Sequence, residues 1–202
     1  MKTNIVIITF FLSTLSFAKT DQLAGAWLGY FANHKLTDKE FLHFETQLRH
    51  NTTDSKMGQT LVRFGVNHSL NERNKVGLLF AYVDSDAAKE YRLALQHQFT
   101  FSSKLSFRQR LEARDIENND SNSIRYRLNT RFDGAVTVWD EVFVNLTRET
   151  WTGDRAFERN RFFIGPKHKF NSFVLEWGYL NQYIPRSEKS AMEHILVGYL
   201  FF

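Results

Sequence analysis

The sequence contains no cysteine and only two prolines in 202 residues. Without cysteine there are no disulfides, no thiolate metal sites and no lipid-modified N-terminal cysteine. The chain also lacks an uninterrupted apolar run of the about 18 residues that a membrane-spanning helix requires. These absences exclude a disulfide-stabilised fold, a thiolate metal centre and a helical membrane protein.

The N-terminus has the pattern of a secretory signal. A single lysine precedes an apolar stretch from Ile5 to Leu12, and Ser16-Phe17-Ala18 then gives the small-x-small pattern typical of signal peptidase sites. We expect residues 1–18 to be removed after Ala18 during Sec-dependent export, which leaves residues 19–202 as one domain. A membrane anchor is the alternative, but the apolar stretch is short and is interrupted by threonine and serine.

Two consecutive segments alternate between charged and apolar side chains. In residues 104–114 one face holds arginines and a glutamate while the other holds leucine, phenylalanine and alanine, and residues 123–132 repeat the pattern. Side chains of a β-strand point alternately to opposite faces, so each segment predicts a strand with one basic and one apolar face. The same period occurs in eleven segments, which are 27–35, 40–50, 58–69, 75–84, 89–99, 104–114, 123–132, 138–149, 159–168, 172–183 and 191–202.

These segments predict an all-β fold, an antiparallel transmembrane β-barrel of about 10–12 strands. A bacterial barrel with both termini in the periplasm needs an even number of strands. Residues 27–35 are therefore expected to be an extra element, either inside the lumen or paired with an unrecognised twelfth strand.

Several features favour a barrel in the bacterial outer membrane. The chain ends in Phe202, preceded at two-residue steps by Leu200, Gly198 and Leu196, like the C-terminal signal that the barrel assembly machinery reads. Short connections alternate with longer polar ones, as periplasmic turns and extracellular loops do. Aromatic side chains fall near the strand ends, as girdles at the lipid interfaces require, with Phe41, Phe99, Phe101, Trp139 and Phe170 at one level and Tyr82, Tyr91, Trp151 and Tyr183 at the other.

The polar faces of the strands predict the lining of the lumen. An arginine that faces lipid costs about 2 to 4 kcal/mol at the membrane midplane, so we expect the strand arginines to turn inward and only the apolar faces to contact outer-membrane lipid. A soluble periplasmic β-barrel that binds a ligand is the alternative. The expected lumen-lining residues are Arg108, Arg110, Arg114, Arg125, Arg127, Arg131, Arg159, Arg161, Glu112, Glu141, Glu149 and Glu176.

Two interpretations of this lumen stay open. Guanidinium groups bind carboxylate and phosphate, which favours a small pore that prefers anions. An arginine–glutamate network that closes a narrow structural barrel explains the same residues. Barrels of about eight strands are filled by side chains and those of about sixteen leave a channel, so the expected size does not decide between them. The net charge of +4 does not indicate nucleic-acid binding, because basic residues are interleaved with apolar and acidic ones.

Enzymatic patterns are weak. Asp84 and Asp86 place two carboxylates beside a long connection, with His50 and His194 as the nearest partners by topology, which gives a rim hydrolase as the least favoured alternative. No Gly-x-Ser-x-Gly occurs, and the seven histidines lack the spacing of metal ligands. We therefore expect no enzymatic activity, no cofactor and no metal.

The C-terminal third resembles a known family. The matching pieces are Asn160-Arg161 followed by Gly165, then Leu175-Glu176-Trp177-Gly178-Tyr179 with Gln182, then His194-Ile195-Leu196 before the terminal aromatic residue. Upstream, Trp27, Arg125-Tyr126-Arg127 and Glu149 fit the same outline. With these pieces the chain resembles the DUF2490 family of uncharacterised outer-membrane proteins over nearly all of residues 19–202. The resemblance implies an outer-membrane barrel of unassigned activity and transfers no catalytic residue.

Overall fold

The computed structural model describes residues 20–51, 56–86, 88–152, 155–187 and 189–202, which form one closed β-barrel. The expected signal at 1–18 lies outside these residues. Within them no helix is long and apolar enough to cross a membrane. The strands are β1 (Thr20–Lys35), β2 (Glu40–Asn51), β3 (Lys56–Ser69), β4 (Asn74–Ser85), β5 (Lys89–Thr100), β6 (Leu105–Ile116), β7 (Ser123–Asp133), β8 (Val136–Asn145), β9 (Phe157–Lys169), β10 (Val174–Ile184) and β11 (Ser190–Phe201).

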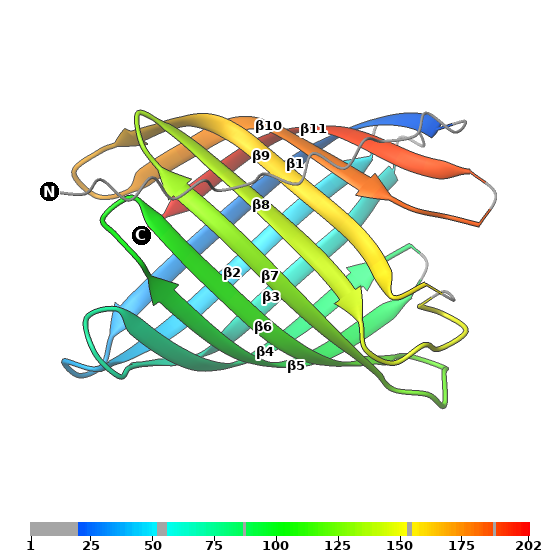
Figure 1. Ribbon diagram of the computed structural model, residues 1–202, viewed down its shortest axis with the longest axis horizontal. Coiled ribbons are helices and arrows are strands. Elements are labelled where there is room, and N and C mark those ends of the chain that lie inside the picture. The colour runs from blue at the N-terminus through cyan, green and yellow to red at the C-terminus, as the bar shows by residue number, and fades with distance from the viewer. Residues whose placement is uncertain (1–19, 52–55, 87, 153–154, 188) are drawn as a thin grey trace, which may run out of the picture.

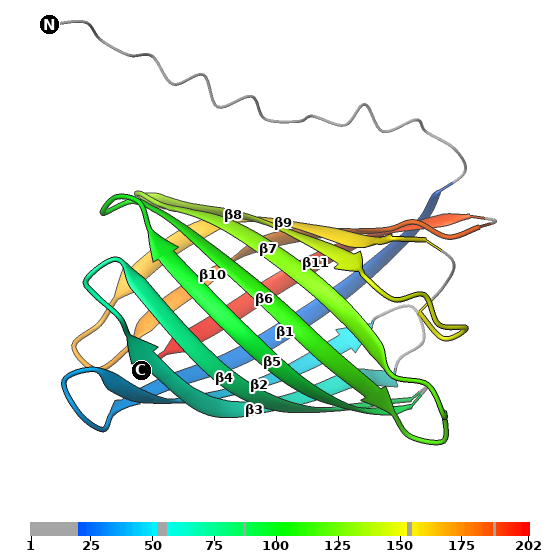
Figure 2. The same cartoon turned by 60° about the horizontal axis from the view of Figure 1, so that its bottom comes forward.

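Each strand pairs with its sequence neighbours in antiparallel fashion, and β1 closes the barrel by pairing in parallel with β11. Figures 1 and 2 show the tilted strands winding around one common axis. The prediction of an antiparallel all-β barrel of 10–12 strands is confirmed, except at this parallel pair. The expectation that residues 27–35 form an extra lumenal element or need a twelfth partner is wrong, because they belong to β1 in the wall.

The two ends of the barrel differ in the connections and the chain terminus that they carry. The C-terminus and the short connections 36–39, 70–73, 101–104, 134–135 and 170–173 lie at one end, which we call the turn end. At the opposite end, which we call the loop end, are Thr20, the first described residue, and the described connecting residues 117–122, 146–152 and 185–187. The turn end lies at the left of Figure 1.

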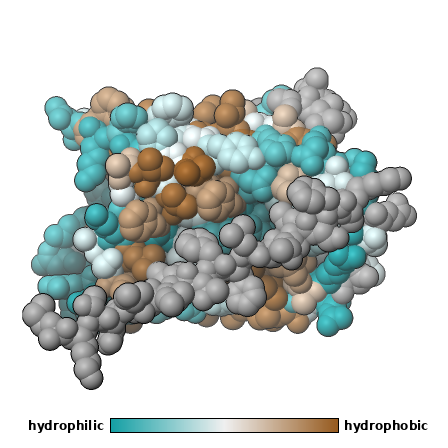
Figure 3. Space-filling view, turned by 45° about the horizontal axis from the view of Figure 1, so that its top comes forward, coloured by the Kyte–Doolittle hydropathy of each residue, from teal (hydrophilic) through white to brown (hydrophobic). Residues whose placement is uncertain are grey.

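The outer wall is apolar. The exposed side chains of the strands are mainly leucine and phenylalanine, including Leu95 and Leu196, and Figure 3 shows hydrophobic residues gathered at mid-height with hydrophilic ones toward both ends. Strands of 10–16 residues are long enough to cross a membrane, for which about 9–11 tilted residues suffice. One carboxylate interrupts this wall, since Asp140 faces outward and accepts a 2.8 Å hydrogen bond from Asn160.

An aromatic girdle surrounds part of the turn end. Ring contacts join Phe44, Tyr30, Phe202, Phe173 and Phe170 in that order, with centroids 4.6 to 6.2 Å apart. The backbone amide of the terminal phenylalanine also donates to β1. The C-terminal residue therefore completes both the girdle and the parallel closure.

Two aromatic residues expected in the girdle face the lumen instead. Trp139 is buried and packs face to face on Phe163 inside the barrel, with ring centroids 5.3 Å apart. Phe41 shares the inward face of β2 with Glu45, and the ammonium of Lys75 lies 5.2 Å from its ring. For Trp139 and Phe41 the error is one of parity, because each residue is one position out of step with the outward side chains of its strand. Trp151 is also outside the girdle, because it lies in the connection after β8, where its ring centroid is 4.9 Å from the guanidinium carbon of Arg114.

Inside the barrel, apolar side chains fill one side. Trp27, Trp139, Phe163, Leu180, Ile195, Val197 and Tyr199 form a cluster over β1 and β8–β11, and Phe31 and Phe201 pack against it. Gly29 makes room for this cluster, because a Cβ at that position would overlap the ring of Tyr199. The remaining side of the lumen holds most of the charged residues, together with buried apolar side chains such as Leu61, Leu79 and Val83.

Candidate functional site

Every arginine in the described strands lines one cavity. The cavity measures about 200 Å³, and the eleven arginines are Arg49, Arg63, Arg92, Arg108, Arg110, Arg114, Arg125, Arg127, Arg131, Arg159 and Arg161. Its lining runs from Glu90 and Arg114 near the loop end to Arg131 and Phe201 near the turn end. Only three carboxylates share this lining, those of Glu45, Glu90 and Glu141. Four further carboxylates pair with lining arginines, so the wall keeps an excess of eleven arginines over seven carboxylates; the four are Glu112, Asp133, Glu158 and Glu176.

Glu112 is the centre of the ion-pair network. Its side chain is fully buried and receives hydrogen bonds from Arg125 at 2.5 Å and Arg127 at 2.7 Å, and a guanidinium nitrogen of Arg110 lies 3.7 Å away. Antiparallel pairing of β6 with β7 places Glu112 directly beside Arg125 and Arg110 beside Arg127. A buried carboxylate of this kind holds like-charged guanidinium groups together that would otherwise repel.

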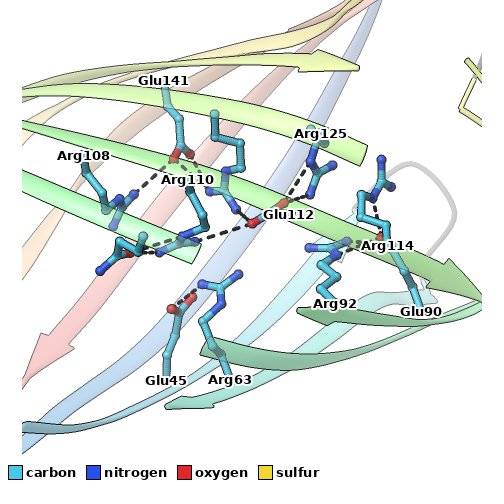
Figure 4. A network of polar contacts seen from close by, with 12 residues as sticks. Glu45, Arg63, Glu90, Arg92, Arg108, Arg110, Glu112, Arg114, Arg125 and Glu141 are labelled. Atoms are coloured by element: carbon cyan, nitrogen blue, oxygen red, sulfur yellow. Dashed lines mark hydrogen bonds and ion pairs between the residues drawn. The ribbon is translucent and has the colours of Figure 1, made fainter. Parts of the chain in front are cut away.

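Ion pairs extend from this centre in both directions (Figure 4). Toward the turn end, Glu141 bridges Arg127 at 2.8 Å and Arg108 at 3.1 Å. Toward the loop end, Glu90 bridges Arg92 at 2.6 Å and Arg114 at 2.5 Å. Bidentate and bridging geometry of this kind fixes both partners.

Glu158 connects the loop-end arginines, although sequence reasoning missed it. Its carboxylate lies 3.0 Å from Arg125, 3.5 Å from Arg114 and 2.7 Å from Arg159. A register shift between β8 and β9 leaves Glu158 without an opposite residue on β8, because Phe143 pairs with Arg159 while Val144 pairs with Phe157. A β-bulge of this kind turns two successive side chains to the same side, which simple alternation cannot predict.

The predicted lining residues fall into three groups. The eight predicted arginines line the cavity, as does Glu141, while Glu112 lies behind them. Glu176 is buried near the turn end, where it pairs with Arg131 and lies 3.8 Å from Lys167. The prediction that Glu149 lines the lumen is wrong, because the expected strand 138–149 is too long. β8 ends at Asn145, and Glu149 lies in the turn closed by Thr152.

Aromatic residues are the main part of the lining that the sequence reasoning did not select. The ring of Phe143 lies under the guanidinium groups of Arg125, Arg127 and Arg161, with carbon-to-centroid distances of 4.5 to 5.3 Å. Trp27 lies under Arg49 and also under Arg161. Parity places Phe143 on the same face as Glu141, so the alternation that identified the arginines could have identified this ring as well.

The loop-end rim does not assemble the predicted hydrolase. In the part of the chain that the structure describes, no interaction joins Asp84 or Asp86 to His50 or His194. His194 instead faces outward, where its ring contacts the hydroxyl of Tyr179 at 2.5 Å. No group of three potential metal ligands occurs among the described residues.

Comparisons with solved structures find porins. A structure titled "KdgM porin" matches with a TM-score of 0.52 and 12% identity, covering 75% of this chain and 80% of that one. A second, titled "KdgM porin in complex with disordered oligogalacturonate", has a TM-score of 0.52, 11% identity and coverage of 77% and 82%. A structure titled "NanC porin" matches with a TM-score of 0.54, 11% identity and coverage of 83% and 88%. At these identities the likeness concerns the fold.

Comparison with curated protein sequences finds no match. Residues 24–193 match the family described as protein of unknown function, DUF2490. This range covers most of the chain and reaches all eleven strands, although it contains only part of β1 and the start of β11. The chain therefore belongs to the DUF2490 family, as its C-terminal motifs indicate.

Proposed function

We propose that this protein is an outer-membrane channel for small solutes that prefers anions. The observation that carries the proposal is the cavity lining, in which eleven arginines outnumber the seven carboxylates that pair with them, those of Glu45, Glu90, Glu112, Asp133, Glu141, Glu158 and Glu176. Clefts lined by one sign of charge between low-dielectric walls concentrate ions of the opposite sign. The lining also extends along most of the barrel, as a conducting path requires.

Placement in the outer membrane is supported by the exterior. The apolar outer wall, the aromatic girdle around Phe202 and the fold shared with porins all suit a lipid environment. On this proposal the barrel assembly machinery inserts the protein. Recovery with outer membranes and faster migration of unheated protein on gels are the expected results, and recovery in the detergent-free soluble fraction would contradict them.

Ion selectivity is the direct test of the channel. Purified protein in a planar bilayer under a KCl gradient should give discrete conductance steps and a reversal potential of the sign that indicates chloride preference. Arg108→Gln should shift that potential toward zero, because the side chain of Arg108 lines the cavity and is 35% exposed. Arg73→Gln is the matched control, since it removes the same charge from an exposed turn outside the cavity.

A sealed structural barrel is the competing function, and the ion-pair network favours it. Side chains joined through Glu112, Glu141 and Glu158 span much of the lumen. With strands spaced by about 4.8 Å and tilted by about 40°, eleven strands enclose a backbone circle of roughly 11 Å radius, between a filled and an open barrel. Repeated absence of conductance from protein that shows the folded gel shift would establish the sealed barrel.

A further inference from the structure

Two of the eleven lining arginines have no carboxylate partner. Within the described residues, no carboxylate oxygen lies within 4.0 Å of Arg49 or Arg161. Arg49 donates to the amide oxygens of Gln47 at 2.7 Å and Gln59 at 2.5 Å. Arg161, which is only 6% exposed, donates through Nε to Gln182 at 2.5 Å, and its two terminal nitrogens have no described acceptor. Neither guanidinium group therefore contacts a carboxylate, although Glu141 lies opposite Arg161 in the pairing of β8 with β9.

Trp27 holds these two groups near each other. The guanidinium carbons of Arg49 and Arg161 lie 4.4 and 4.8 Å from its ring centroid, so they are no more than about 9 Å apart. A cation–π contact stabilises an arginine through its flat face and leaves the N–H groups at the edge free to donate. The indole ring of Trp27 thus positions the two guanidinium groups without using any of their N–H donors.

The pair lies where two cavities meet. A second cavity of about 180 Å³ opens toward the loop end, and Trp27, Arg49 and Arg161 line both it and the central cavity. Its wall beside the arginines is formed partly by Ala24, Gly25, Ile184 and Ile195. One carboxylate, that of Glu193, also lines this cavity and accepts a hydrogen bond from Gln182, the residue to which Arg161 donates. A solute that enters from the loop end therefore meets these two charges next to apolar surface.

We propose that Arg49 and Arg161 form a binding site for small organic carboxylates at this junction. A carboxylate matches the fork of a guanidinium in shape and charge, and two forks within about 9 Å suit a short dicarboxylate. The apolar wall contacts a carbon skeleton, which inorganic phosphate and chloride lack. The inference names the solute class of the proposed channel and rests on it only for transport, because binding itself requires no conduction.

Titration calorimetry of the folded, detergent-solubilised protein at low ionic strength tests the site, with succinate, inorganic phosphate and chloride as probes. Saturable succinate binding is expected, with clearly weaker phosphate binding. Arg49→Gln and Arg161→Gln should each weaken succinate binding about tenfold or more, since each removes charge-assisted hydrogen bonds. Arg186→Gln is the control: it removes a charge from an exposed connection at the same end and should change affinity less than twofold.

Arg161→Lys separates fork recognition from simple attraction. Lysine keeps the charge and lacks the planar fork, so succinate affinity should fall several-fold here also. Full affinity in the lysine variant, unchanged affinity in both glutamine variants, or equal affinity for phosphate would each overturn the proposal. Gel shift and far-UV circular dichroism show which variants are folded, and Arg161→Lys remains informative if a glutamine variant is not.

The two proposals fail separately. Conductance with anion preference but no succinate binding refutes the carboxylate site and leaves the channel intact. Succinate binding by protein that never conducts refutes the channel and leaves the site intact. Where both hold, succinate should reduce chloride conductance through the wild-type protein and not through Arg161→Gln.

Discussion

Replacing Glu112 by glutamine tests whether the ion-pair network stabilises the barrel. The change keeps the size of the side chain but removes the carboxylate that receives hydrogen bonds from Arg125 and Arg127. Breaking a buried ion pair by removing one partner costs about 3–5 kcal/mol. Because Arg125 keeps Glu158 and Arg127 keeps Glu141, we expect the lower end, about 3 kcal/mol less free energy of unfolding.

Urea unfolding of the protein in phospholipid vesicles, followed by tryptophan fluorescence, measures this loss. Glu117→Gln is the matched control because its carboxylate pairs with Lys89 at 3.7 Å and both side chains are nearly half exposed, so its unfolding midpoint should equal that of the wild type. Adding Arg110→Gln to Glu112→Gln should recover part of the lost stability, since it removes one of the charges left unpaired. Equal midpoints for Glu112→Gln and Glu117→Gln would refute the reasoning.

Three further predictions concern the two faces of the wall. Phe163→Ala, at a fully buried position in the lumenal cluster, should lower the free energy of unfolding by about 3–5 kcal/mol, whereas Phe64→Ala on the outer wall should cost clearly less in the same urea assay. Deleting Phe202 should reduce the fraction of folded barrel in outer membranes more than Phe101→Leu does; equal yields would contradict its role in closure and assembly. Asp140→Asn should raise stability by up to about 1 kcal/mol, because a charge leaves the lipid-facing wall while the amide oxygen can still accept the hydrogen bond from Asn160, and a loss of stability would show that this hydrogen bond depends on the carboxylate.

The strands could be predicted because alternation is a local property of the sequence. Nine of the eleven strands need only their sequence neighbours as partners, so period and turn positions are enough to order them. The partner of β1 is different, since it lies at the other end of the chain and pairs in parallel. No periodic signal distinguishes such a strand from a lumenal segment, and the assumption of an even strand count led to the wrong placement.

The charged lining was partly predictable for the same reason. Arg108, Arg110 and Arg114 fall on one face by parity, and the arginines of β7 follow by hairpin pairing. Parity fails where the register changes, which is why Glu158 was missed. Which arginines lack a carboxylate contact could not be predicted, because it depends on side chains from strands far apart in sequence, such as Arg161 near Trp27.

The two sides of the lumen bear on the choice between a channel and a sealed barrel. Filling a barrel for stability alone requires only apolar side chains, as the cluster around Phe163 and Leu180 shows. Buried ion pairs are a poor substitute, because replacing them with apolar residues of similar volume is often neutral or stabilising. Burying Arg49 and Arg161 is costlier still, since no carboxylate contacts either guanidinium group to offset the loss of water around it. This cost favours a lumen whose charges act on solutes over one that is merely filled.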